Sequence, residues 1–159
     1  MAAPESGSVI VLGELPPHLV LMLQQIPIAE ELSSADAEDR LFSEPSTDPE
    51  LVADWKAYVQ PELLESFRTA RQVVESDLKR MLEMEGRRSL EIPLSHADAW
   101  LNALNQLRLA IAAAHHLSDE ELSREEAPQA QTTRELAILR IHFYGYLQHV
   151  ILDAMGAGE

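Results

Sequence analysis

Residues 100–111 constrain the fold most, because they form an apolar helix that carries an arginine on its apolar side. At about 100° per residue, four large side chains share one narrow arc, which predicts that they lie in the core: Trp100, Leu104, Leu107 and Ile111. Arg108 projects between Leu104 and Leu101, and Asn105 lies just beyond Leu101. A charge among core residues needs a partner. Either the fold or a bound molecule must therefore supply a group that binds Arg108.

Length and composition indicate one domain without disulfides. The chain has 159 residues, of which 46% are hydrophobic, so residues 1–159 are long enough to form a single core. No apolar run is long enough to cross a bilayer, and the first residues lack the pattern of a secretory signal. The chain contains no cysteine, which excludes disulfides and thiolate chemistry. We expect a cytoplasmic protein.

The net charge of −15 argues against nucleic acid and membrane partners, because both are held largely by lysine and arginine. Two acidic segments, 30–47 and 118–131, are predicted to be loops. Arg68, Arg71 and Lys79 form a basic stripe on one predicted helix. Oppositely charged residues alternate along that helix at i,i+4, which is typical of a salt-bridged solvent face. Transcriptional regulation therefore stays an alternative and not the first hypothesis.

The pattern of the whole chain predicts a mainly α fold, a bundle of about five helices with a small two-stranded β pairing. The two strands are residues 8–12 and 89–93. Helices are predicted to begin at Pro16, Asp48, Pro61, Ser95 and Thr132, each position being typical of a helix start. The third of these helices is expected to continue to about residue 85, before Gly86. In the second, the inward stripe is predicted to include Leu51 and Tyr58.

The last predicted helix is apolar over much of its circumference. Its core face is predicted to consist of seven residues: Leu136, Leu139, Phe143, Tyr146, Leu147, Val150 and Ala154. Ile138, Ile141 and Leu152 lie on the other side of the same helix. A helix of this kind is central in its fold or lies at a subunit contact. Homodimerisation through this helix is therefore a hypothesis.

The segment Trp100-Leu101-x-x-Leu104-Asn105-x-Leu107-Arg108-Leu109 resembles the signature of a bacterial family known as domain of unknown function 2017. The order of the other pieces is also similar over nearly the whole chain, from Arg40-Leu41-Phe42 to Tyr146-Leu147-Gln148. The resemblance implies no assigned activity and no catalytic residue. Members of that family are frequently encoded beside the small adaptor of the Clp protease, which implies a role in regulated proteolysis or another regulatory process.

Asn105, Arg108 and Gln148 are the candidate binding residues. Asn105 and Arg108 stand one helical turn apart, and Gln148 on the last helix is a possible third member. One interpretation is a recognition point for a carboxylate, because a guanidinium binds a carboxylate through two parallel hydrogen bonds. The other is an internal network that joins two helices, in which a nearby Asp or Glu neutralises Arg108. The sequence leaves both open.

Metal and catalytic sites are weakly indicated. His142, His149 and Asp153 fall on one side of the last helix, but about 10 Å of rise separates the two histidines. A partly solvated face with a His149–Asp153 pair is the simpler interpretation, and His115-His116 suits a helix C-terminus. The sequence lacks a phosphate loop, His-Glu-x-x-His and Gly-x-Ser-x-Gly. We therefore predict no cofactor.

The sequence favours a non-enzymatic protein that binds another protein as an adaptor or regulator. The reasons are the lack of a catalytic motif and the excess apolar surface of the last helix. A metal- or small-molecule-dependent enzyme of an unrecognised type is the second alternative, after a transcriptional regulator.

Overall fold

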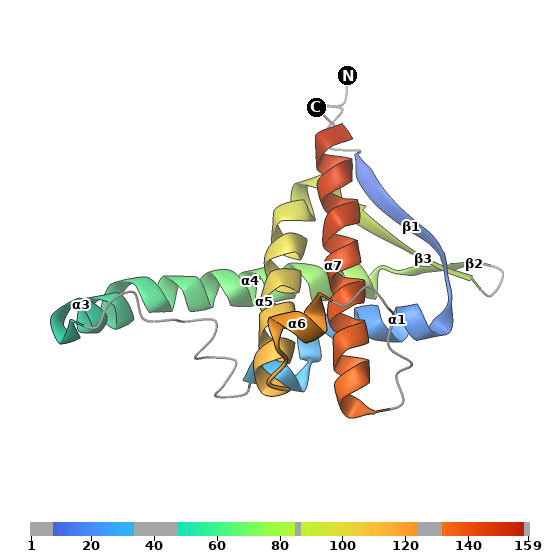
Figure 1. Ribbon diagram of the computed structural model, residues 1–159. Coiled ribbons are helices and arrows are strands. Elements are labelled where there is room, and N and C mark those ends of the chain that lie inside the picture. The colour runs from blue at the N-terminus through green and yellow to red at the C-terminus, as the bar shows by residue number, and fades with distance from the viewer. Residues whose placement is uncertain (1–7, 34–47, 85–86, 124–131, 158–159) are drawn as a thin grey trace, which may run out of the picture.

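A computed structural model describes residues 8–33, 48–84, 87–123 and 132–157. Three long helices dominate it: α4 (Gln60–Lys79), α5 (Ala97–Ala114) and α7 (Thr133–Ala157). Figure 1 shows α5 and α7 side by side with opposite directions, and α4 crossing them. Trp100, Leu104, Leu107 and Ile111 are fully buried between these helices, so the predicted core arc of residues 100–111 is confirmed. No helix in the described ranges is long and apolar enough to cross a membrane.

A small antiparallel sheet covers one side of the helices. The strand β1 (Val9–Leu15) pairs with β3 (Arg87–Pro93), with Ile10 opposite Ile92, which confirms the predicted pairing of residues 8–12 with 89–93. A third strand, β2 (Leu82–Met84), pairs with the other edge of β3. The predicted helix to residue 85 is therefore too long. Backbone pairing with β3 outweighs the helix propensity of Leu-Glu-Met.

The N-terminal helices begin largely where the sequence places them. Helix α1 (Pro17–Gln24) has proline at its first position. Helix α3 (Pro49–Asp54) begins after Asp48, whose side chain accepts a hydrogen bond from the Glu50 N–H at 2.9 Å. A π-helical turn, Trp55–Val59, joins α3 to α4 just before Pro61, which has no N–H to donate. Short 3₁₀ turns follow α1 at Ile26–Ile28 and Glu30–Ser33.

Two predicted inward residues of this region are exposed. Leu51 is 54% and Tyr58 is 73% exposed, because α3 and the start of α4 extend away from the body of the molecule (Figure 1). The predicted anchor Arg40-Leu41-Phe42 and most of the 30–47 segment lie outside the described residues.

The start of α5 differs from the prediction. A 3₁₀ turn, Leu94–His96, precedes the helix, and its N-cap is His96 instead of Ser95. The His96 side chain does not cap the helix, because its Nδ1 lies 2.9 Å from the Asp77 carboxylate.

The segment 118–131, predicted to be a loop, contains the short helix α6 (Asp119–Leu122). Ser118 and Glu121 form a capping box there. The rest of that segment is outside the described residues from residue 124 to residue 131.

The prediction of the core face of α7 is confirmed only in part. The buried residues are Ala137, Ile141, Tyr144, Leu147 and Ile151. Of the predicted core residues Leu147 is buried, and Phe143 and Ala154 pack against the core. The prediction is wrong for Leu136, which is 45% exposed, and for Tyr146, which is 65% exposed. The helical periodicity of the sequence is compatible with two apolar faces and does not indicate which of them is buried. The structure buries the one that carries Tyr144, whose hydroxyl donates to the Met22 carbonyl at 2.8 Å.

Candidate functional site

Arg108 lies at the seam between α5 and α7 and is partly buried. Its Nη1 donates to Gln148 Oε1 at 2.6 Å, and Gln148 Nε2 donates to the Leu101 carbonyl at 3.3 Å. The guanidinium lies against Gly145, where an added Cβ would come within 3.3 Å of Arg108 Cζ and Nη2. The structure thus brings Arg108 and Gln148 together as the sequence proposed. Together with Gly145 and the Leu101 carbonyl they form what we call the Arg108 site.

No described carboxylate pairs with Arg108, so its charge is not neutralised by the described part of the fold. Burial lowers the pKa of Arg108, which means that the surroundings disfavour its charged form. Its Nε is buried without a hydrogen-bond partner among the described residues. Asn105 is exposed on the same helix, and no described contact joins it to Arg108. The partner of this arginine is therefore an amide, and part of its hydrogen-bonding capacity is unused.

Arg140, on α7, differs from Arg108 in having a carboxylate partner, although its Nε is likewise buried without a hydrogen-bond partner among the described residues. Arg140 donates to Glu31 at 2.7 Å and 3.2 Å, and His115 Nε2 lies 3.1 Å from the same carboxylate. The two charged side chains are only 12% and 14% exposed. Burial would raise the pKa of Glu31, but hydrogen bonds from Arg140 and His115 lower it to about 2. This cluster joins the turn at Glu30–Ser33 to α5 and α7, and its charges are internally paired.

A buried carboxylate also joins α4 to α5. Asp77 is fully buried, accepts a hydrogen bond from Trp100 Nε1 at 2.8 Å, contacts His96 Nδ1, and pairs with Arg80. The sequence analysis missed this residue. Its signal was present, because Asp77 falls on the helical face of Val74 and Leu78. The same criterion that singled out Arg108 would have found it.

One flank of α7 carries a row of apolar side chains. We call it the outer stripe, and its residues follow alternating steps of three and four: Leu136, Leu139, Phe143, Tyr146 and Val150. Leu136 and Tyr146 are exposed, and the other three are partly buried, with Phe143 packed against the core. Residues 136–152 contain no Asp or Glu, although the chain has 27 acidic residues. Spacing of this kind is typical of a helix that packs against another helix.

The histidines predicted as weak metal candidates lie apart. His142 Nε2 lies 3.0 Å from the Leu122 carbonyl, whereas His149 pairs with Asp153 at 3.4 Å. Within the described ranges no group of three or more His, Asp or Glu side chains is placed to hold a metal ion.

The predicted basic stripe of α4 carries ion pairs. Arg68 pairs with Glu65 at 3.2 Å and Lys79 with Glu75 at 3.4 Å, as expected for a solvent face. Arg71 lies on the same helix and is partly buried.

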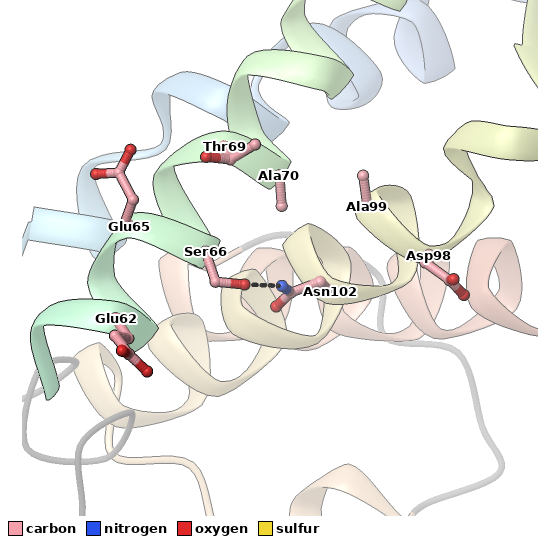
Figure 2. Close-up of a pocket in the computed structure, with 8 residues that line it drawn as sticks. All are labelled: Glu62, Glu65, Ser66, Thr69, Ala70, Asp98, Ala99 and Asn102. Atoms are coloured by element: carbon pink, nitrogen blue, oxygen red, sulfur yellow. Dashed lines mark hydrogen bonds between the residues drawn. The ribbon is translucent and has the colours of Figure 1, made fainter. Parts of the chain in front are cut away.

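A groove opens between α4 and α5. Figure 2 shows the residues that line it. Asn102 Nδ2 donates to Ser66 Oγ across it at 3.4 Å. The carboxylates of Glu65 and Asp98 lie at opposite ends and point away from each other (Figure 2). Acidic groups that do not converge form no evident cation site.

Comparison with known protein families identifies a match to the chain. The model of the family described as Domain of unknown function (DUF2017) matches residues 7–155, nearly the whole chain. No curated protein and no solved structure matches the chain.

Proposed function

This chain belongs to the DUF2017 family, a domain of unknown function, and we propose that it is a non-enzymatic protein that binds another protein as an adaptor or regulator. The observation that carries the proposal is the outer stripe of α7. Leu136 is 45% and Tyr146 is 65% exposed on this row, so both side chains are available to pack against another surface.

The charge distribution supports a protein partner at this face. A chain of net charge −15 repels other acidic proteins over most of its surface. Because residues 136–152 carry no carboxylate, the outer stripe escapes that repulsion. A helix laid along the stripe would meet side chains at the regular spacing that helix pairs use.

A second copy of the chain is one partner that this face suits. A two-fold contact would place two carboxylate-free stripes together, so carboxylates would not face one another along the stripes themselves. Partners from regulated proteolysis enter the proposal only through the family resemblance. We also propose a cytoplasmic location, with which the lack of cysteine is consistent.

The test is to purify the tagged protein from a native lysate of its own host, with Tyr146→Glu as the variant. We expect the wild type to retain one protein at a stoichiometric ratio, and Tyr146→Glu to lose it. Tyr58→Glu is the matched control, because Tyr58 is 73% exposed on another helix and far from the stripe in the chain. A partner retained by all three proteins would refute the role of the outer stripe.

Light scattering at micromolar concentration tests homodimerisation separately, because it measures the mass of the particle in solution. A dimer has twice the mass of the 17.7 kDa chain, and Tyr146→Glu should convert it to a monomer. A monomeric wild type would exclude self-association and leave a different protein as the partner.

A further inference from the structure

We infer that the Arg108 site binds a carboxylate group, presented by an acidic side chain or by the C-terminus of a polypeptide. This site is separate from the outer stripe, because Gly145 and Gln148 lie on the flank of α7 that faces α5. The inference therefore does not depend on the proposed function.

The hydrogen-bonding capacity of Arg108 is the first argument. A guanidinium has five N–H donors. Gln148 takes one of them, from Nη1, and no described residue accepts from Nη2 or Nε. Nε is buried, whereas Nη2 lies against the bare backbone of Gly145 in a residue that is partly exposed. The Nη1–Nη2 edge therefore keeps donors for an incoming ligand.

The arrangement around the guanidinium is the second argument. Gln148 holds its oxygen toward Arg108, because its amide nitrogen is bound to the Leu101 carbonyl. Gly145 leaves the space that the guanidinium plane occupies, since a Cβ there would stand 3.3 Å from Cζ. The arginine is thus oriented before any ligand arrives, which reduces the entropy that binding must overcome.

The unopposed charge selects the class of ligand. Charged groups removed from water are stable only when a counter-charge or a network of hydrogen bonds replaces the lost hydration. Arg140, on α7, has Glu31 for this purpose, and Arg108, on α5, has no such partner in the described chain. A carboxylate matches the planar fork of one guanidinium with two parallel hydrogen bonds. A phosphate dianion would favour a second cation, which the described surroundings of Arg108 do not provide.

The experiment is an NMR titration of the ¹⁵N-labelled full chain at constant ionic strength, with chloride replaced by acetate. The Arg108 Nε–Hε signal is assigned by its loss in Arg108→Met. We expect a saturable shift of this signal with acetate, and a weakening of the apparent affinity by about tenfold or more in Gln148→Ala. Arg68→Met is the matched control and should leave the acetate shift unchanged, because Arg68 is an exposed arginine of α4.

Two short peptides distinguish the sources of the carboxylate. One is N-acetylated with a free C-terminus and no acidic side chain, and the other is amidated with one aspartate. The peptide that binds more tightly identifies the source. A shift that does not saturate, or one that is equal at exposed arginines, would show only general anion screening and would overturn the inference. Acetate binding in Tyr146→Glu must equal that of the wild type, so the outcome is independent of the outer stripe.

The variant Arg108→Lys distinguishes a loss of acetate binding from a loss of folding. It keeps the positive charge but loses the planar fork, so the variant should fold and bind acetate about tenfold more weakly. Unchanged acetate binding by Arg108→Lys would contradict recognition through two parallel hydrogen bonds.

Discussion

Arginine-to-methionine substitutions at positions 140 and 108 should have opposite consequences for stability. Arg140→Met removes the main partner of a carboxylate that stays partly buried. Arg108→Met removes a charge that no described carboxylate opposes. The two arginines come from neighbouring helices and receive the same substitution. The difference between the two changes in the free energy of unfolding therefore shows whether each arginine is paired with a carboxylate.

The expected loss for Arg140→Met follows from the pKa of Glu31. Its fall from 4.5 to about 2 corresponds to about 3 kcal/mol of stabilisation of the ionised form in the folded protein. His115 stays 3.1 Å from the same carboxylate and retains part of this effect. We therefore expect a loss of about 2–3 kcal/mol, or a fall in Tm of about 4 to 12 °C for a domain of this size.

Arg108→Met should leave the free energy of unfolding unchanged or raise it by about 1 kcal/mol. Replacing a buried charge by an apolar side chain of similar size is often neutral or stabilising. The variant loses the 2.6 Å hydrogen bond to Gln148 but no longer desolvates an unopposed cation. A loss of about 3–5 kcal/mol would instead show that Arg108 is paired internally, and would refute the assignment of an open site.

The pH dependence of the free energy of unfolding tests the role of the Arg140–Glu31 pair independently. Because the pKa of Glu31 is lower in the folded protein, its stabilising effect is complete above pH 4.5 and disappears as the pH falls toward 2. The difference between the wild type and Arg140→Met should therefore be constant near neutral pH and shrink below pH 4.5. Urea unfolding at pH 7, 4 and 2.5 measures it. A difference that does not change with pH would mean that Arg140 stabilises the fold by packing alone.

Three further substitutions follow from the same geometry. Gly145→Ala should raise helix stability by up to about 1 kcal/mol and weaken acetate binding, because its Cβ displaces the Arg108 guanidinium; thermal unfolding and the NMR titration measure the two effects. Asp77→Ala should cost about 3–5 kcal/mol and change the fluorescence of Trp100, which loses its hydrogen-bond acceptor. Thr132→Ala should cost about 1 kcal/mol in urea unfolding, since the Thr132 hydroxyl accepts from the backbone at the start of α7.

The sequence predicted local structure well where a single helix face or turn decides it. The arc around Trp100 is buried, the caps at Asp48 and Thr132 are present, and strand β1 pairs with the predicted segment. Each of these depends on residues a few positions apart or on an alternating apolar run. Local chemistry is enough for such features.

The sequence could not predict features that depend on distant partners. Helix α7 has two apolar faces, and only packing against α5 and the Met22 carbonyl selects the one that carries Tyr144. Glu31 and Arg140 stand 109 residues apart, and nothing in either segment indicates that they pair. The proximity of Arg108 to Gln148 was predicted, but the lack of a carboxylate there depends on where every described acidic residue lies.

The three partly buried charge clusters together indicate where this protein interacts with something else. Asp77 is neutralised by Arg80 and surrounded by donors, and Glu31 is neutralised by Arg140. The fold thus pairs each of these two carboxylates with an arginine. At Arg108 it instead provides a neutral amide and a bare stretch of backbone. An apolar side chain would fill the same space at lower cost in free energy. An anion bound at Arg108 would supply the missing counter-charge and offset the free energy of burying the guanidinium. The unpaired charge of the free protein is therefore the argument for a ligand between α5 and α7.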